Sequence, residues 1–287
     1  MEFRHFREED YQAVCDFLIA LNEPGRSHIN WNWARFEWMY EHPEFDKNAK
    51  SAIGLWTDGD RVVGAAIYDM YFGEAFCAAL PEYASLFPEI LAYAYDALKD
   101  ENGLAIALCD ENAAEIEAAR KQGLVPTEQS ETMMEADLGR DFTPAFPEGL
   151  HAESPDPVKD AYAIQWLFWQ GFDHGGDRAE FERTEQIVPQ VRRHFLPELG
   201  VAAVNRSGEP VAICCLWHDE RTDYAYTEPV CTIPAYRGRG AGRAVVYEAL
   251  NRAKARGAKK AYVISDQPFY EKLGFRRCRR FTFYRKR

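Results

Sequence analysis

Three glycines within five positions give residues 238–242 the composition of an anion-binding loop. They stand in the run Pro234-Ala235-Tyr236-Arg237-Gly238-Arg239-Gly240-Ala241-Gly242-Arg243, which follows a strand-like apolar stretch and precedes a helix-like one. Glycines leave backbone N–H groups uncovered, and the start of a helix adds its positive dipole end at the same place. The segment is therefore typical of a loop that holds a diphosphate through main-chain amides.

The elements around this loop follow the order strand, loop, helix, strand. Apolar residues recur at helical spacing in one segment and run continuously in the others. We expect a helix over 242–256, ended by Gly257, and strands over 201–204, 211–217, about 224–232 and 261–264. A helix that joins two parallel strands places the loop at the carboxyl end of its strand, where α/β proteins usually bind ligands.

A second motif lies downstream, in Phe269-Tyr270-Glu271-Lys272-Leu273-Gly274-Phe275. Together with Arg237-x-x-Gly240-x-Gly242, it resembles the GNAT superfamily of acyl-CoA-dependent N-acetyltransferases, which carries an R/Q-x-x-G-x-G/A loop and a Y-x-x-x-G-F closure. A glycine loop alone is also found in ordinary surface turns, whereas loop, spacing and closure together are specific. The resemblance implies acetyl-CoA as co-substrate and a mixed sheet whose two central parallel strands splay apart around the pantetheine arm.

The resemblance also implies which residues hold the cofactor. The backbone of Val230, Cys231 and Thr232, at the end of the strand, would pair with pantetheine and donate to the thioester carbonyl. The loop residues that would bind the diphosphate are Arg237, Gly238, Arg239, Gly240, Ala241, Gly242 and Arg243. The position of Cys231 also allows a covalent nucleophile, although the resemblance implies direct transfer without an acyl-enzyme.

Two side chains match the catalytic positions of the family. Glu228 lies six residues before Pro234, where many members place an acidic general base, and the alternative is a solvated strand carboxylate. Pro229 cannot donate to a strand ladder, so a bulge or edge there would change the face to which Glu228 points. Tyr270 matches the tyrosine that protonates the departing sulfur, and the alternative is a packing aromatic at a helix start.

The chain contains two copies of one unit. Leu80-Pro81-Glu82-Tyr83 matches Ile233-Pro234-Ala235-Tyr236, and Lys121-Gln122-Gly123-Leu124 matches Lys272-Leu273-Gly274-Phe275, at offsets of 153 and 151 positions. Prolines and a glycine interrupt the periodicity in 141–149, where we place the boundary. The predicted fold is α/β, of α+β mixed-sheet type, with two tandem GNAT domains over 1–148 and 149–287.

The first copy lacks the diphosphate loop. In place of residues 237–242 it has Ala84-Ser85-Leu86-Phe87-Pro88-Glu89, without glycine or arginine and with one carboxylate. Side chains would cover the amides, proline removes a donor, and Glu89 repels phosphate. We therefore predict that residues 1–148 form a degenerate domain and that residues 149–287 form the catalytic one.

Composition narrows the class of function. The 287 residues carry a net charge of −12, with 47% hydrophobic residues. The acidic excess lies in residues 1–148, whereas basic residues outnumber acidic ones in 149–287, so the half with the glycine loop would attract a polyanionic cofactor. The acidic total and the lack of a recognised nucleic-acid-binding module argue against nucleic acid as a partner.

No targeting, membrane or metal pattern stands out. No apolar run is long enough to span a bilayer, and the charged N-terminus does not resemble a secretory signal, so we expect a cytoplasmic protein. The seven cysteines include no C-x-x-C pair and read as reduced apolar residues rather than metal ligands. Aromatic segments at 30–40 and 166–169 are typical of core, although in the family such regions also shape the acceptor pocket.

The resemblance implies an N-acetyltransferase that moves an acetyl group from acetyl-CoA to a primary amine of a small molecule or peptide. The alternative from another class is a non-catalytic acyl-CoA sensor, in which the same loop binds the cofactor and no amine is acetylated. The sequence does not identify the acceptor, the acyl chain length or the oligomeric state.

Overall fold

The chain forms two compact units. The computed structural model describes residues 1–26, 28–42, 44–184 and 193–287. The first unit contains Met1–Met134, Ile264–Tyr270 and Arg276–Arg287, and the second contains Glu135–Val263 and Glu271–Phe275. This division differs from the predicted boundary at 148/149 in two ways. The first unit's longest segment ends near residue 134, inside a strand. The strand that contains residues 276–286 packs with the first unit and not with the second.

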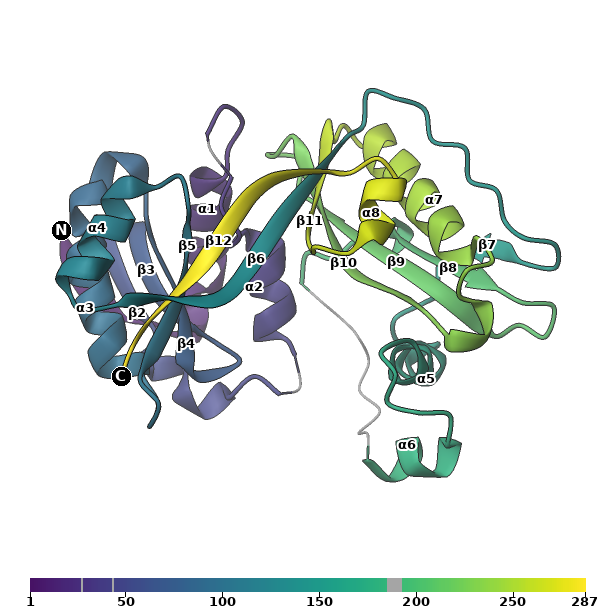
Figure 1. Ribbon diagram of the computed structural model, residues 1–287, viewed down its shortest axis with the longest axis horizontal. Helices are drawn as coiled ribbons and strands as arrows, with labels where there is room; N and C mark the ends of the chain where they lie inside the picture. Colours follow the sequence, from purple (N-terminus) through teal and green to yellow (C-terminus); the bar gives the residue numbers. More distant parts are fainter. Residues whose placement is uncertain (27, 43, 185–192) are drawn as a thin grey trace. The chain divides into compact units, whose positions relative to one another are not determined.

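The first unit is a sheet with helices on both faces. Its strands lie in the order β1 (Glu2–His5), β2 (Gly54–Asp58), β3 (Arg61–Asp69), β4 (Tyr71–Ala79), β5 (Leu104–Cys109), β12 (Arg276–Lys286) and β6 (Val125–Asp137). Helices α3 (Phe87–Leu98) and α4 (Ala113–Lys121) cover one face, and α1 (Tyr11–Leu21) and α2 (Trp33–Tyr40) cover the other (Figure 1). Short 3-10 turns, η1 (Glu8–Asp10), η2 (Lys47–Ala52) and η3 (Pro81–Leu86), join these elements.

The second unit repeats the same plan. Its strands lie in the order β11 (Lys260–Ile264), β10 (Tyr224–Thr232), β9 (Pro210–His218), β8 (Gly200–Val204) and β7 (His151–Glu153). Helix α7 (Ala241–Ala255) packs on one face of this sheet and α5 (Ala161–Gly171) on the other (Figure 1). The remaining elements are α6 (Arg178–Thr184), η4 (Pro197–Leu199), η5 (Pro234–Tyr236) and α8 (Pro268–Lys272).

The predicted elements of this unit agree with the structure. Each predicted strand and the predicted helix lie within two residues of β8, β9, β10, β11 and α7. The pairing of β10 with β11 is parallel, as the strand, loop, helix, strand order requires. The sequence pattern predicts these elements correctly because buried apolar runs alternate with clear glycine turns.

One strand pairing departs from the repeat. By sequence, the first copy ends with β6, which would be expected beside β5. Instead β12 lies antiparallel to β5, from Phe281 opposite Cys109 to Lys286 opposite Leu104, and β6 lies on the other side of β12 (Figure 1). The end of the chain therefore completes the sheet of the first unit.

The aromatic segment of residues 30–40 belongs mainly to the core of the first unit. Trp31 and Trp33 are each 1% exposed, and Phe36 is fully buried. Trp31 stacks on Phe76 of β4, with ring centroids 5.3 Å apart. These contacts confirm the prediction that this segment is core, since rings this deeply buried contribute apolar area rather than a ligand surface.

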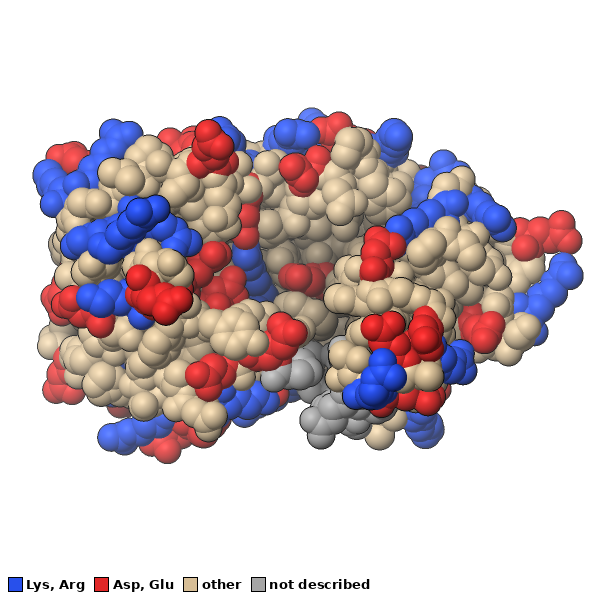
Figure 2. Space-filling view, turned by 60° about the horizontal axis from the view of Figure 1, so that its bottom comes forward, with Lys and Arg blue, Asp and Glu red and all other residues tan. Residues whose placement is uncertain are grey.

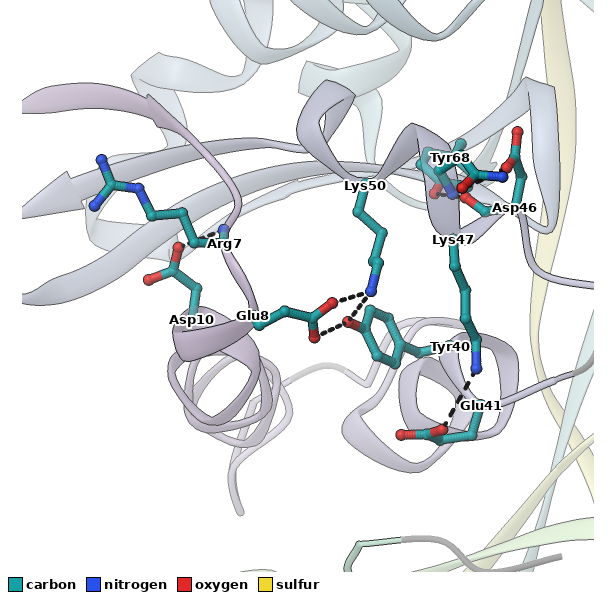
Figure 3. A network of polar contacts seen from close by, with 10 residues as sticks. Arg7, Glu8, Asp10, Tyr40, Glu41, Asp46, Lys47, Lys50 and Tyr68 are labelled. Atoms are coloured by element: carbon teal, nitrogen blue, oxygen red, sulfur yellow. Dashed lines mark hydrogen bonds and ion pairs between the residues drawn. The ribbon is translucent and has the colours of Figure 1, made fainter. Parts of the chain in front are cut away.

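A polar network fixes η2 against the N-terminal helices (Figure 3). Lys50 of η2 pairs with Glu8, and the Tyr40 hydroxyl of α2 donates to the same carboxylate at 2.7 Å. Lys47 lies 3.9 Å from Glu41. The network ties together segments that are distant in sequence at the edge of the aromatic core.

Charges of both signs are mixed on the face that Figure 2 shows, where Lys and Arg side chains are interspersed with Asp and Glu. This pattern differs from the continuous basic stripe that is typical of nucleic-acid-binding proteins. Within the described ranges, every helix is too short or too polar to cross a membrane.

The position of β12 generates a stability prediction. Phe283 on this strand is 3% exposed, so Phe283→Ala should lower the free energy of unfolding by about 3–5 kcal/mol through lost burial and a residual cavity. Thr282→Ala removes an exposed bond to Asp110, which directly follows β5, and should cost less than about 1.5 kcal/mol. Urea unfolding of both variants measures the difference, and equal costs would contradict the placement of β12 in the core.

Candidate functional site

The site begins where β10 and β11 part. Their parallel pairing covers only Tyr224 to Tyr226, opposite Lys260 to Tyr262. Beyond that point the register of β10 against β9 shifts between Thr227 and Val230, and the Glu228–Pro229 peptide is cis. The second half of β10 therefore pairs with β9 on one side and turns its other backbone edge away from the β11 ladder.

The predicted cofactor residues of the strand end lie along this edge. Cys231 and Thr232 pair with Ile213 and Ala212 of β9 on the opposite side. Val230 and Thr232 are half-buried, whereas Cys231 is 6% exposed. The structure thus brings the strand end to the start of the glycine loop, as the sequence predicts.

The glycine loop connects η5 to α7 in a conformation that requires glycine. Gly238 has φ +72° and Gly240 has φ +95°, in the left-handed region that other residues rarely adopt. The first helical hydrogen bond of α7 runs from Ala244 N–H to the Gly240 carbonyl at 3.0 Å. The N–H groups of residues 241–243 therefore have no hydrogen-bond acceptor within the helix, as at every helix start. Gly238 and Arg239 are exposed to solvent.

The Arg237 side chain is engaged with protein oxygens. Its guanidinium donates to the Thr232 carbonyl at 2.9 Å and to the Gly171 carbonyl at 2.8 Å, and it pairs with Asp173 at 2.9 Å. Gly171 is the last residue of α5, so Arg237 ties the loop to the end of that helix and to the end of β10. Arg239 and Arg243 are exposed, and the Arg239 guanidinium lies 6.0 Å from the Tyr236 ring centroid.

Close packing holds α5 against the strand end. A Cβ atom at Gly171 would lie 2.6 Å from Cys231 Sγ, so only glycine allows this approach. The Cys231 thiol lies 3.9 Å from the Leu167 carbonyl in a small apolar cluster. Burial raises the pKa of this thiol to about 12, and the neighbouring Arg237 lowers it only in part.

Glu228 lies at the irregular point of β10. It is half-buried, and its backbone carbonyl accepts a hydrogen bond from the Trp217 indole at 2.7 Å. The register shift at this point agrees with the predicted bulge at Pro229. The strand is thus held at Glu228 by a side chain from β9 rather than by a regular ladder.

Tyr270 lies on α8 and is 7% exposed. Its ring makes an edge contact with Phe269, with centroids 5.1 Å apart. The closing Gly274 has φ +88°, and its Cα is covered by the Arg140 guanidinium, which donates to the Leu273 carbonyl. By its contacts Tyr270 belongs to the first unit, whereas Glu228 and the loop belong to the second.

A pocket opens between α5 and η5 within the second unit. Its volume is about 440 Å³, and its walls include Tyr162, Trp166, Tyr236 and Arg178. The Arg178 guanidinium lies 5.1 Å from the Trp166 ring centroid. Of the aromatic segment 166–169, Trp166 therefore lines a pocket, whereas Trp169 is 8% exposed and packs inside.

Sequence reasoning missed the residues that anchor the loop from α5. Gly171 and Asp173 carry no motif of their own, and only their contacts with Arg237 and Cys231 identify them. The same holds for Arg140, which secures the Gly274 turn from 134 positions earlier in the chain. Side chains that act on a distant backbone oxygen leave no short-range signal in the sequence.

The raised pKa of Cys231 generates a chemical prediction. A thiol with a pKa of about 12 holds almost no thiolate at neutral pH, so iodoacetamide at pH 7.5 should leave Cys231 unmodified in the native protein. Peptide mass spectrometry after denaturation in the same reagent, which should label all seven cysteines, is the control. Rapid native labelling of Cys231 would contradict its burial and reopen a covalent route through this residue.

Comparisons with known proteins agree with this geometry. Residues 159–275 match the family model described as Acetyltransferase (GNAT) family. A glucosamine 6-phosphate N-acetyltransferase from Trypanosoma brucei brucei is 39% identical over 54 residues, which is 18% of this chain, and the match spans 37% of the length of that relative.

Solved structures resemble the chain over almost its full length. A tandem GNAT protein from the clavulanic acid biosynthesis pathway has a TM-score of 0.61 and 15% identity, and covers 99% of this chain and 97% of its own. A GCN5-related N-acetyltransferase from Sphaerobacter thermophilus has a TM-score of 0.59 and 16% identity, with 99% and 95% covered. At these identities the likeness concerns the fold, and it confirms the predicted mixed α/β architecture of tandem GNAT type. Residues 159–275 are therefore similar to the GNAT family of acetyltransferases.

Proposed function

We propose that the protein is an N-acetyltransferase that moves the acetyl group of acetyl-CoA directly to a primary amine of a small molecule or peptide. The observation that carries this proposal is the parting of β10 from β11 immediately before a loop of left-handed glycines. We also propose that residues 149–287 supply the catalytic residues and that the protein acts in the cytoplasm.

The loop fits a diphosphate. A Cβ at Gly238 would have no heavy atom within 4 Å, so nothing in the described residues obstructs the approach of a ligand to this backbone. Amides at the start of α7 and the exposed Arg239 and Arg243 would donate to phosphate oxygens. The Arg237 side chain would hold the loop in place through Thr232 and Gly171, and a phosphate contact of its own stays a prediction.

The strand end fits a thioester. Backbone groups of Val230, Cys231 and Thr232 on the side away from β9 would pair with the pantetheine amides and donate to the thioester carbonyl. Such donors favour the oxyanion that forms when an amine attacks, because they are fixed before the reaction begins. Since backbone groups supply this role, the burial of the Cys231 side chain is compatible with it.

Two side chains would move the protons. Glu228 would accept a proton from the acceptor ammonium, directly or through water, so that the amine nitrogen can attack the carbonyl carbon. The tetrahedral intermediate would collapse with cleavage of the carbon–sulfur bond, and the Tyr270 hydroxyl would protonate the departing thiolate. Both assignments come from the matched family positions.

The acceptor is proposed to be a small-molecule amine. The curated relative from Trypanosoma is named for glucosamine 6-phosphate, and this name supports a small amine rather than a large protein substrate. The aromatic pocket between α5 and η5, which contains Trp166 and Tyr236, is a candidate for part of the acceptor site.

The first copy is proposed to bind no acetyl-CoA diphosphate. Its η3 turn continues into α3, with Phe87 N–H bonded to the Ala84 carbonyl, and no left-handed residue occurs in the described residues 81–89. The Glu89 carboxylate accepts from the Trp56 indole at 2.7 Å, so it packs on β2. These features support a degenerate copy because the bare amides of the second loop have no counterpart here.

A sensor that binds acyl-CoA without acetylating an amine is the alternative function. Mass spectrometry of a panel of amines incubated with acetyl-CoA separates the two. An enzyme forms an adduct heavier by the mass of one acetyl group less one hydrogen, and releases free coenzyme A in equal amount. A sensor forms neither above background.

A matched pair of glycines tests the loop. Gly240 and Gly257 lie at the two ends of α7, both have positive φ, and a Cβ placed on either would have no heavy atom closer than 3.9 Å. Gly240→Ala should weaken coenzyme A binding at least about tenfold, since each lost bond to a charged group costs about 1.5–3 kcal/mol. Gly257→Ala carries a similar backbone cost and should leave the affinity unchanged in isothermal titration calorimetry. Equal affinities would refute the loop as the diphosphate site.

The role of Tyr270 is tested by kinetics. Tyr270→Phe should lower turnover by about 10²–10⁴-fold and leave the acceptor KM nearly unchanged, because the hydroxyl acts on the leaving thiolate and not on the acceptor. Thiol release at saturating acetyl-CoA is the measurement. Tyr247→Phe, on a ring that packs against Phe142, is the control and should retain full activity. Full activity of Tyr270→Phe would remove its acid role.

A further inference from the structure

The first unit keeps a cleft at the place equivalent to the cofactor site. Strands β4 and β5 pair in parallel only at Glu74 and Ala75, opposite Ala105 and Ile106. Beyond these residues β4 continues along β3 while β5 continues along β12, so the two strands diverge. A cavity of about 630 Å³ opens at their ends, a volume that suits a small organic ligand.

The walls of this cleft are largely apolar. Leu21, Ile29 and Phe87 contribute from the end of α1, the segment after it and the start of α3. Small residues from the end of β4, from η3 and from α4 complete the apolar surface: Ala79, Ala84, Ala114 and Ala118. A ligand in this cleft would therefore bury an apolar body.

The basic side chains of the cleft are already neutralised. Arg279 pairs with Glu111, and its guanidinium also lies 4.0 Å from the Cys109 thiol. Arg26 pairs with Glu23 at 2.7 Å and with Glu82 at 3.5 Å. Two arginines that each have an acidic partner leave no surplus of positive charge to select an anion.

Glu115 is the acidic side chain of the cleft that lacks such a partner. It projects from the first turn of α4, and within the described part of the chain its carboxylate hydrogen-bonds with the Asn112 side chain and forms no ion pair. Burial raises the pKa of this carboxyl to about 7, and its negative charge in turn helps to raise the pKa of Cys77 on β4. A carboxylate held in an apolar cleft without a cation is destabilised, and a cationic ligand would relieve that cost.

We propose that the cleft between β4 and β5 binds a small organic cation, an alkylammonium with an apolar body, whose ammonium group pairs with Glu115. The apolar chain lies against Phe87 and Ala118, and the ammonium also reaches the Asn112 side-chain oxygen. The site is separate from the glycine loop, and it stands whether or not the second unit acetylates an amine.

Calorimetry with hexylammonium chloride tests the site, in full-length protein and without acetyl-CoA. Neutral 1-hexanol and anionic hexanoate match its chain length and differ in charge. We expect hexylammonium to bind at least tenfold more tightly than either. Three results would overturn the proposal. Equal binding of hexanol would show that only the apolar chain is recognised. Tighter binding of hexanoate would show that the arginines bind the charged group, and no binding of any of the three would show that the cleft takes no such ligand.

Variants locate the binding on Glu115. Glu115→Gln should abolish the preference for hexylammonium, whereas Glu117→Gln, an exposed carboxylate on the same helix that pairs with Lys121, should leave it unchanged. Ala118→Phe fills the cleft without removing the carboxylate and should also abolish binding. An amine that binds in the second unit would be unaffected by both substitutions, and retention of hexylammonium binding in both would overturn the proposal.

The pH dependence provides an independent check. The alkylammonium stays charged between pH 6 and 8, whereas Glu115 with a pKa of about 7 ionises across this range, so affinity should rise about tenfold from pH 6 to pH 8. Glu115→Gln should remove this slope. His28 also lines the cleft and histidines titrate near neutrality, so a slope that persists in Glu115→Gln would assign the effect to His28 and contradict the proposal.

Thermal stability shows that the variant is folded and that the carboxyl is buried. A carboxyl whose pKa is raised on folding binds its proton more tightly in the native state, so native stability decreases as the pH rises from about 4 to above 7. Glu115→Gln should therefore melt at a higher temperature than the wild type at pH 8 and at a similar temperature at pH 5. A variant that melts lower at both values would place Glu115 in a structural role instead.

Discussion

This structure depends on a parallel strand pairing that ends after a few residues in each unit. In each unit two parallel strands share a ladder of only two or three residue pairs and then diverge. Backbone groups beyond that point must find other partners, because unpaired amides and carbonyls in a protein interior are costly. In the second unit the divergence of the strands exposes a strand edge beside a glycine loop. In the first unit it opens an apolar cleft. The two copies thus share an opening and differ in what lines it.

The two openings differ in the residues that line them. In the second unit, left-handed Gly238 and Gly240 expose amides at a helix start, a surface suited to phosphate. In the first unit, a 3-10 turn runs into α3 without such residues, and among the described residues that line the cleft Glu115 is the carboxylate that forms no ion pair. Helix-start amides in one opening and the Glu115 carboxylate in the other favour ligands of opposite charge.

Much of this fold could be predicted from the sequence because its signals are local. Glycine spacing, apolar runs and the end of a helix at Gly257 act within a few residues, and the elements of the second unit follow them closely. The repeat landmarks predicted tandem architecture for the same reason. The expectation that residues 30–40 form core also held, since aromatic rings at helical spacing must be buried on one face.

The rest depends on contacts between residues that are far apart. Strands β6 and β12 are similar in length and position within their copies, so nothing in either predicts that β12 lies beside β5. Likewise Arg237 reads as a phosphate ligand in the motif, and only the structure shows that three protein oxygens surround it. The raised pKa of Glu115 arises from an apolar cavity formed by several separate segments, which no spacing rule describes.

The place of β12 also constrains how the protein is made. A protein chain emerges from the ribosome with its N-terminus first, and domains generally fold as they emerge. Here β5 pairs with residues 276–286, which are translated long after it, so one edge of β5 stays uncovered until then. Contacts of such long sequence separation slow folding, so the nascent first half has an open sheet edge, a feature that favours aggregation, while the second half is synthesised.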